Sequence, residues 1–315
     1  MDRLTRRTFF GSAAIAAGAA MSGCSFASRA KGATSFAYGK HNRIRVTVPG
    51  LAQDVRVLVV GDTHLDLADG RDAEYAGYYK RLKRDQGHPE AFRKMIAKVK
   101  DEKPDILLLA GDIMSFPTLA NVEFLKSTLD ESGLNWFYVA GNHDWHFEGV
   151  PGSDEQQREQ WIAKRLMPLY QGRDPLMSSC SVKGMRFVAI DNSVYHVNER
   201  QLEFWKSEAA KGESMVLFMH IPLWTEGWGL FTCGNPGWGA ATDPYWEIER
   251  REKWAPSQSP STFAFREAVL STPNLAAVFS GHIHQIMTAV ERGKFMFSVP
   301  DNRKGAYVDA RFTAG

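Results

Sequence analysis

The sequence predicts an α/β fold in which many of the strands pair in parallel. Segments with strand and helix character alternate along the chain after residue 42. The runs at 55–60 and 105–110 are predominantly apolar, as in strands that are buried on both faces. Three more strand-like segments follow residue 286, which indicates a second sheet packed on the first.

In the first half of the predicted domain, the strand at 43–48 alternates polar and apolar residues, and the strand at 55–60 is rich in β-branched residues. Helical spacing follows at 89–103, where Phe92, Ile96 and Val99 fall on one face. The remaining elements expected in this half are a strand at 105–110, a helix at 121–129, a strand at 136–140 and a helix at 155–166.

In the second half, strands are expected at 185–190, 215–219 and 275–279, with helices at 199–209 and 261–270 between them. Strand-like segments at 287–291, 295–299 and 307–312 follow. The segment 224–260 interrupts this order, because it holds five tryptophans and four prolines with little periodicity. A loop of this length is usually functional or disordered, and its tryptophans favour an ordered flap.

The first 24 residues have the character of a secretory signal peptide. Arg6 and Arg7 precede two phenylalanines and a short run of small apolar residues, a pattern that resembles a twin-arginine export signal. An ordinary Sec signal is the alternative. Residues 21–24 resemble a bacterial lipobox in which Cys24 would be lipidated, and the alternative is soluble release by cleavage near residues 25–27.

Residues 25–42 have the composition of a tether, so the folded domain is expected to cover residues 43–315. The predicted location is the bacterial cell envelope, where the protein would be periplasmic or lipid-anchored. Apart from such an anchor, no membrane contact is expected. A membrane-spanning helix needs about 18 consecutive apolar residues without charge, and no other stretch of the sequence is nearly that long. In an oxidising periplasm, Cys180 and Cys233 could pair.

Composition and charge exclude several classes of protein. The chain has 315 residues, of which 44% are hydrophobic and only three are cysteine, which excludes disordered, collagen-like and disulfide-dense chains. Its formal net charge of +2 gives no indication of nucleic-acid binding.

Five expected strand ends are each followed at once by residues of the types that bind metal ions. These residues are Asp62 and His64, then Asp112, then Asn142, His143 and Asp144, then His220, and finally His282 and His284. Because ligands bind beyond the carboxyl ends of strands in open α/β sheets, these side chains are expected to converge. Mixed imidazole and carboxylate ligands suit transition metals, and so many ligands favour two ions that share one carboxylate.

Together these motifs resemble the complete motif set of the calcineurin-like metallophosphoesterases, over about residues 55–300. The resemblance implies a four-layer α/β/β/α sandwich with two mixed central sheets and a pair of Mn, Fe or Zn ions at one sheet edge. It implies that Asp62, His64 and His284 hold one ion, that Asn142, His220 and His282 hold the other, and that Asp112 bridges both. It also implies that His143 protonates the leaving oxygen and that Asp144 orients His143.

The implied reaction is the hydrolysis of a phosphate ester by direct attack of a metal-bridging hydroxide. A phosphodiester is slightly favoured, although His143 would assist a poor leaving group in either a diester or a monoester. The alternatives are a phosphomonoesterase of the same fold and a non-catalytic metal-binding protein of the cell envelope. The partner would be a small-molecule or lipid-headgroup phosphate ester.

Candidate substrate contacts are His196, Trp224 and Trp228. His196 follows another strand end, together with Asp191, Asn192 and Tyr195. The two tryptophans lie directly after His220 and could form an aromatic wall beside the substrate. Their alternative role is to pack the loop onto the body of the protein.

Overall fold

The computed structural model describes residues 35–39, 42–79, 87–147, 149–228, 232–236 and 258–315. The expected signal peptide, the candidate lipidation site Cys24 and the tryptophans at 238, 246 and 254 lie outside the described residues. Within the described part, no helix is both long enough and apolar enough to cross a membrane.

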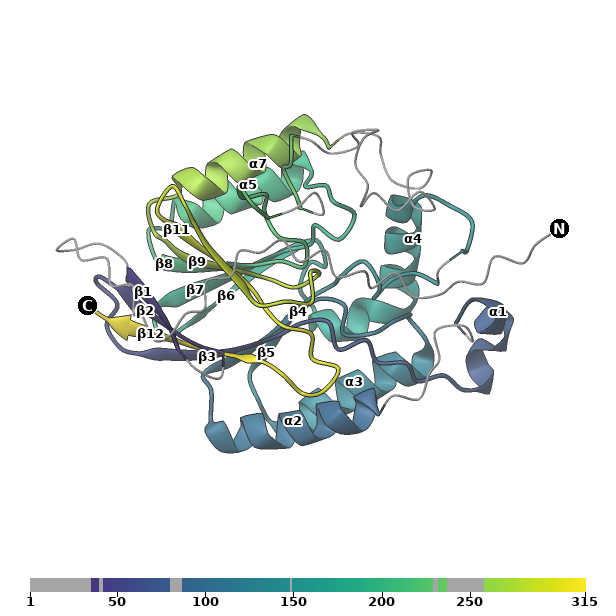
Figure 1. Ribbon diagram of the computed structural model, residues 1–315. Helices are drawn as coiled ribbons and strands as arrows, with labels where there is room; N and C mark the ends of the chain where they lie inside the picture. The colour runs from purple at the N-terminus through teal and green to yellow at the C-terminus, as the bar shows by residue number, and fades with distance from the viewer. Residues whose placement is uncertain (1–34, 40–41, 80–86, 148, 229–231, 237–257) are drawn as a thin grey trace.

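Two mixed sheets of six strands form the centre of the fold (Figure 1). The first contains, in spatial order, β1 (Ser35–Gly39), β2 (Arg43–Val48), β12 (Val308–Ala314), β3 (Val55–Val60), β4 (Ile106–Ala110) and β5 (Trp136–Val139). The second contains β10 (Met287–Glu291), β11 (Lys294–Ser298), β9 (Leu275–Ser280), β8 (Ser214–Phe218), β7 (Met185–Ile190) and β6 (Met177–Val182). Strands β3, β4 and β5 are parallel in one sheet, and β7, β8 and β9 are parallel in the other.

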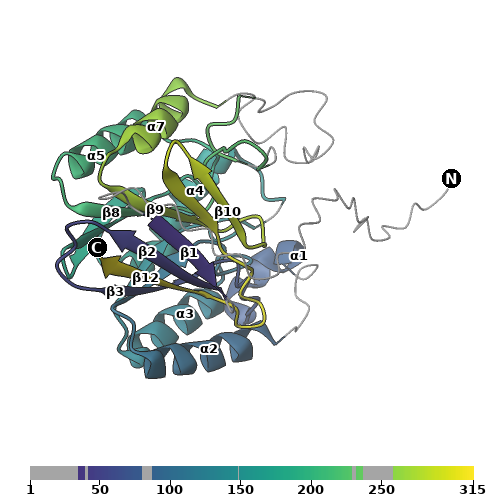
Figure 2. The same ribbon diagram turned by 60° about the vertical axis from the view of Figure 1, so that its left-hand side comes forward.

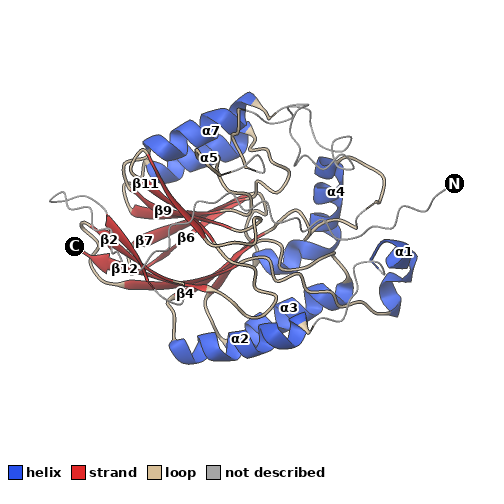
Figure 3. Cartoon of the chain, viewed as in Figure 1, coloured by secondary structure: helices blue, strands red, loops and turns tan. Residues whose placement is uncertain are grey.

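The longer helices cover the outer faces of the two sheets, as Figure 3 shows in colour. Helices α2 (His88–Glu102) and α3 (Leu119–Ser132) lie on the first sheet, and α5 (Glu199–Ala209) and α7 (Pro260–Ser271) lie on the second. The shorter α1 (Ala76–Tyr79) follows a 3-10 turn at Gly70–Tyr75, and α4 (Asp154–Trp161) continues into a π-helical turn at Ile162–Leu166 and a 3-10 turn at Met167–Tyr170.

Three apolar cores separate these layers. Along β3, Val57 and Val59 point into the core between the two sheets, whereas Leu58 and Val60 point into the core beneath α2 and α3. A third core lies between the second sheet and the pair α5 and α7. The predicted four-layer sandwich with two mixed sheets is therefore confirmed.

Most expected elements are found with bounds that differ by at most three residues, but one described α-helix and two described strands were not expected. They are α1, β6 and β1, and β1 lies within the segment expected to be a tether, so that expectation is wrong for Ser35–Gly39. Figure 2 shows β1 facing the edge of the second sheet, where Phe36 packs on Phe295 of β11 with ring centroids 4.7 Å apart. This contact between sheets supplies the strand with apolar burial that its own short sequence does not indicate.

The two described cysteines are free thiols, so the suggested pairing of Cys180 with Cys233 is not observed. They lie on opposite sides of the second sheet, because Cys180 packs beside the core between the sheets and Cys233 belongs to the core under α5 and α7. Burial raises the pKa of the Cys180 thiol to about 11 and that of Cys233 to about 12, so both remain protonated at neutral pH.

Candidate metal centre

The ligand-type residues occupy sharp bends directly after the strand ends. Five of them adopt positive φ angles: Asp62 (54°), His64 (52°), Asp112 (51°), His282 (72°) and His284 (55°). This left-handed backbone is unfavourable for residues other than glycine and persists only where the surrounding structure enforces it. Its concentration in three neighbouring loops marks them as a functional site.

Backbone hydrogen bonds join these loops to one another. The amide of Asp62 donates to the carbonyl of Gly111 (3.0 Å), and the amide of His64 donates to the carbonyl of Asp112 (3.0 Å). The loops of the second sheet are joined in the same way, because Gly281 N donates to His220 O (2.9 Å). The loops of the first sheet contact those of the second sheet where the amide of His282 donates to the Asp62 carboxylate (3.0 and 3.1 Å).

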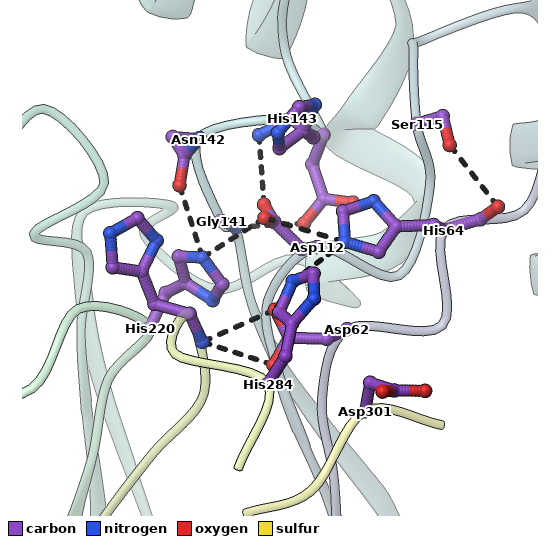
Figure 4. A network of polar contacts seen from close by, with 12 residues as sticks. Asp62, His64, Asp112, Ser115, Gly141, Asn142, His143, His220, His284 and Asp301 are labelled. Atoms are coloured by element: carbon purple, nitrogen blue, oxygen red, sulfur yellow. Dashed lines mark hydrogen bonds and ion pairs between the residues drawn. The ribbon is translucent and has the colours of Figure 1, made fainter. Parts of the chain in front are cut away.

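The first group of ligand atoms consists of Asp62, His64 and His284, which converge on one point (Figure 4). Nε2 of His284 lies 3.2 Å from Oδ1 of Asp62 and 3.2 Å from Nε2 of His64. A single proton can bridge only one of these pairs, whereas a cation among them would satisfy all three atoms.

The second group consists of Asp112, His220 and His282, with Asn142 beside them. Nε2 of His220 lies 3.1 Å from Oδ2 of Asp112 and 3.1 Å from Oδ1 of Asn142. Its Nδ1 lies 2.9 Å from the carbonyl oxygen of Ala110, to which it can only donate. This bond fixes the tautomer in which Nε2 carries the lone pair that faces the site.

Asp112 connects the two groups. The oxygen that contacts His220 also lies 4.0 Å from Nε2 of His64 in the first group. Asp112, His64 and His143 form a further set of three whose ligand atoms lie within 4.8 Å of one another. A bridging position for Asp112 therefore agrees with the geometry.

The electrostatics of the cluster fit bound cations. Burial alone would raise the pKa of Asp112, but His220 and His143 outweigh it and hold this pKa well below the ordinary value. Burial likewise disfavours the charged form of His220, yet Asp112 raises the pKa of His220 to about 9. The buried carboxylate thus relies on a positive charge at the position where metal ions would supply it. The mixed nitrogen and oxygen donors match transition metals.

His143 and Asp144 lie beside the proposed metal ligands. The His143 amide donates to Oδ1 of Asp112 (2.8 Å), and the His143 ring lies 5.0 Å from the ring of His64. Asp144 is fully buried, and its two oxygens accept the amides of Met114 and Gly141, both at 2.7 Å. These contacts tie two ligand loops together, while orientation of His143 by Asp144 stays a prediction.

Two glycines allow these loops to approach closely. A Cβ atom on Gly141 would overlap the side chain of Asp112, lying 2.8 Å from its Cγ, and one on Gly111 would lie 2.6 Å from Nδ1 of His220.

We therefore expect Gly141→Ala to displace Asp112 and reduce kcat/KM by about 100-fold, the usual cost of a misplacement near 1 Å. Gly77→Ala, in an open helical position, is the matched control and should leave activity unchanged. Full activity of Gly141→Ala would contradict the tight packing of these loops.

The candidate substrate contacts have different surroundings. Trp228 is 7% exposed and belongs to the core under α5 and α7, which agrees with its alternative role of packing the loop onto the body of the protein. Trp224 is partly buried, and the Arg266 guanidinium covers its ring at 4.8 Å. The Nδ1 atom of His196 accepts the amide of Ser259 (3.1 Å), the N-cap of α7. Substrate contacts by Trp224, Trp228 and His196 stay predictions.

Three further residues lie near the proposed metal ligands but were not predicted from the sequence to take part in the metal site. His88 begins α2, and its Nδ1 lies 2.9 Å from the carbonyl oxygen of His64. The ring of His146 lies 5.6 Å from the ring of His143 and contacts the carbonyl oxygen of Asn142. Tyr195 places its hydroxyl 2.6 Å from Nε2 of His282. Two of them had a local signal, because His146 is the second histidine of the Asn142 loop and Tyr195 follows the same strand end as His196.

Comparisons with known proteins show the family of this chain and solved structures that are similar to it. The model of the calcineurin-like phosphoesterase family matches residues 55–286. Among solved structures, a dimetal phosphatase from Danio rerio superposes with a TM-score of 0.51 at 13% identity, covering 79% of this chain and 88% of that one. A phosphopantetheinyl hydrolase from Mycobacterium tuberculosis gives a TM-score of 0.39 at 12% identity, over 82% and 96% of the two chains. No curated protein matches the chain significantly.

Proposed function

Because this chain belongs to the calcineurin-like phosphoesterase family, a family of metal-dependent phosphoric ester hydrolases, we propose that it hydrolyses a phosphodiester at the site described above. The observation that carries this proposal is the position of Asp112 between two groups of ligand atoms, with His143 beside it. A small-molecule or lipid-headgroup diester is the proposed substrate class.

Two divalent or trivalent transition-metal ions are proposed to occupy the site. Asp62, His64 and His284 would hold one ion, Asn142, His220 and His282 would hold the other, and Asp112 would contact both. When bound, such ions lower the pKa of a water molecule and neutralise charge on the phosphoryl oxygens.

The protein itself contributes position and a proton. The Asp112 carboxylate, fixed by the amide of His143, sets the distance between the two ligand groups. The His143 side chain, close to both His64 and Asp112, is proposed to donate a proton to the leaving oxygen. Proton donation of this kind matters most for a poor leaving group such as an alkoxide, which natural phosphodiesters and phosphomonoesters both have.

The choice between esters can be measured with bis(p-nitrophenyl) phosphate and p-nitrophenyl phosphate. With added Mn, we expect a kcat/KM for the diester at least about tenfold higher, a difference of about 1.4 kcal/mol in activation free energy. A chelator should abolish both activities and Mn should restore them, because the Lewis acid and the activated water are lost together. A preference for the monoester would identify a phosphomonoesterase, and bound metal without turnover of either ester would favour a non-catalytic protein.

Residues 1–24 support a separate proposal about location. Their paired arginines, apolar run and Cys24 favour export to the bacterial cell envelope, either as a periplasmic or as a lipid-anchored protein.

A further inference from the structure

Tyr195 lies in the loop that follows β7 and reaches a proposed metal ligand. Its side chain is completely buried, and its hydroxyl oxygen lies 2.6 Å from Nε2 of His282. The two rings meet edge to face, with centroids 5.5 Å apart. The residue has a positive φ of 63°, so the backbone is held in an unfavourable conformation at this contact.

The loop that carries Tyr195 is fixed to the His220 segment. The amide of Tyr195 donates to the carbonyl of Asn192 (2.8 Å). The side chain of Asn192 in turn holds both backbone groups of Ile221, donating to its carbonyl (2.7 Å) and accepting its amide (3.0 Å). The loop that carries the phenol is therefore bound, through Asn192, to Ile221, the residue directly after His220. His220 is another proposed ligand of the same ion as His282.

The two histidines of this group then use opposite ring nitrogens. In His220, Nδ1 donates to a carbonyl and Nε2 faces Asp112 and Asn142. In His282, the hydroxyl at 2.6 Å occupies the approach to Nε2, so a metal ion must bind at Nδ1. A neutral imidazole presents a lone pair on Nδ1 only when Nε2 carries the proton.

We propose that Tyr195 is a positioning residue that accepts the Nε2–H of His282 and fixes the tautomer whose Nδ1 binds the second metal ion. This inference rests on the proposed dinuclear site. Partners that orient metal-binding histidines are usually carboxylates, backbone carbonyls or water, and their loss typically weakens metal binding. Here a buried phenol has that position, with its hydroxyl 2.6 Å from Nε2 of His282.

The test compares Tyr195→Phe with the wild-type full-length chain. Removing only the hydroxyl should weaken binding of the second Mn by about 10–100-fold and leave the first Mn unchanged. Calorimetric titration measures the two affinities, and electron paramagnetic resonance should show loss of the exchange-coupled Mn pair with retention of a mononuclear signal. Tyr170→Phe is the matched control, because this buried hydroxyl has no hydrogen-bond partner within the described structure.

A double-mutant comparison tests whether Tyr195 acts through His282. His282→Ala should lose the second ion by itself, and Tyr195→Phe should add no further loss in that background. Two Mn ions bound by Tyr195→Phe with wild-type affinities, or additive losses in the double variant, would overturn the proposal. If the wild-type chain binds only one ion, the dinuclear site itself is wrong, which is a separate result.

An independent measurement covers the case in which Tyr195→Phe fails to fold. The 15N spectrum of the imidazole groups in the Zn-loaded wild-type chain reports which nitrogen of His282 is protonated. A proton on Nε2 is expected, and a proton on Nδ1 would overturn the proposal.

Discussion

Asp112→Asn is expected to lose both the second metal ion and the activity. Among the described carboxylates, that of Asp112 lies within 4.0 Å of a proposed ligand nitrogen from each of the two groups. These nitrogens are Nε2 of His64 in the first group and Nε2 of His220 in the second. An amide keeps the size of the side chain but removes its negative charge, and two neighbouring cations then face each other without a shared anion. We expect kcat/KM to fall at least about 10³-fold, equivalent to about 4 kcal/mol of transition-state stabilisation.

The measurements are metal content after dialysis and hydrolysis of bis(p-nitrophenyl) phosphate. Asp72→Asn is the matched control, because Asp72 is also completely buried but pairs with Arg165 and caps the amide of Leu119 away from the metal ligands. That variant should be less stable while its metal content stays unchanged. If Asp112→Asn retained two ions and a rate within about tenfold of wild type, Asp112 would not be the bridging ligand.

The convergence of the proposed metal ligands could be predicted from the sequence because their positions follow from topology. Asp62 and Asp112 follow the neighbouring parallel strands β3 and β4, while His220 and His282 follow the neighbouring parallel strands β8 and β9. Since parallel strands end at the same edge, ligand-type residues at each end had to come together. Packing of the two sheets against each other then places the two aspartates and the two histidines in one cluster.

Features that depend on packing between distant segments could not be predicted in this way. Trp228 has the same local sequence signal whether it faces a substrate or the core, and only the structure shows it buried beneath α7. The contact of Tyr195 with His282 joins residues 87 positions apart and depends on the course of two loops. Strand β6 is rich in serine, and its pairing with β7 rather than its composition decides its conformation.

His143→Ala is expected to retain both metal ions and to lose rate selectively on substrates with poor leaving groups. The His143 amide holds Oδ1 of Asp112, and this backbone contact survives removal of the ring. The ring itself lies beside His64 and Asp112, where we propose that it donates a proton to the leaving oxygen. For an alkyl phosphodiester the rate should fall about 10²–10⁴-fold, the usual contribution of general acid catalysis. For a p-nitrophenyl ester the loss should be much smaller, because p-nitrophenolate leaves without protonation.

His146 provides the discriminating control, because its ring also lies next to that of His143, at a centroid distance of 5.6 Å, and unlike His64 it is not a proposed metal ligand. Each variant is assayed on one alkyl and one p-nitrophenyl diester at equal Mn loading, so that a change in metal content cannot imitate a change in chemistry. The ratio of the two rates should change in His143→Ala and stay constant in His146→Ala. The reverse pattern would assign proton donation to His146, and a constant ratio in both variants would exclude an imidazole acid at this end of the site, leaving the metal pair as the source of leaving-group stabilisation.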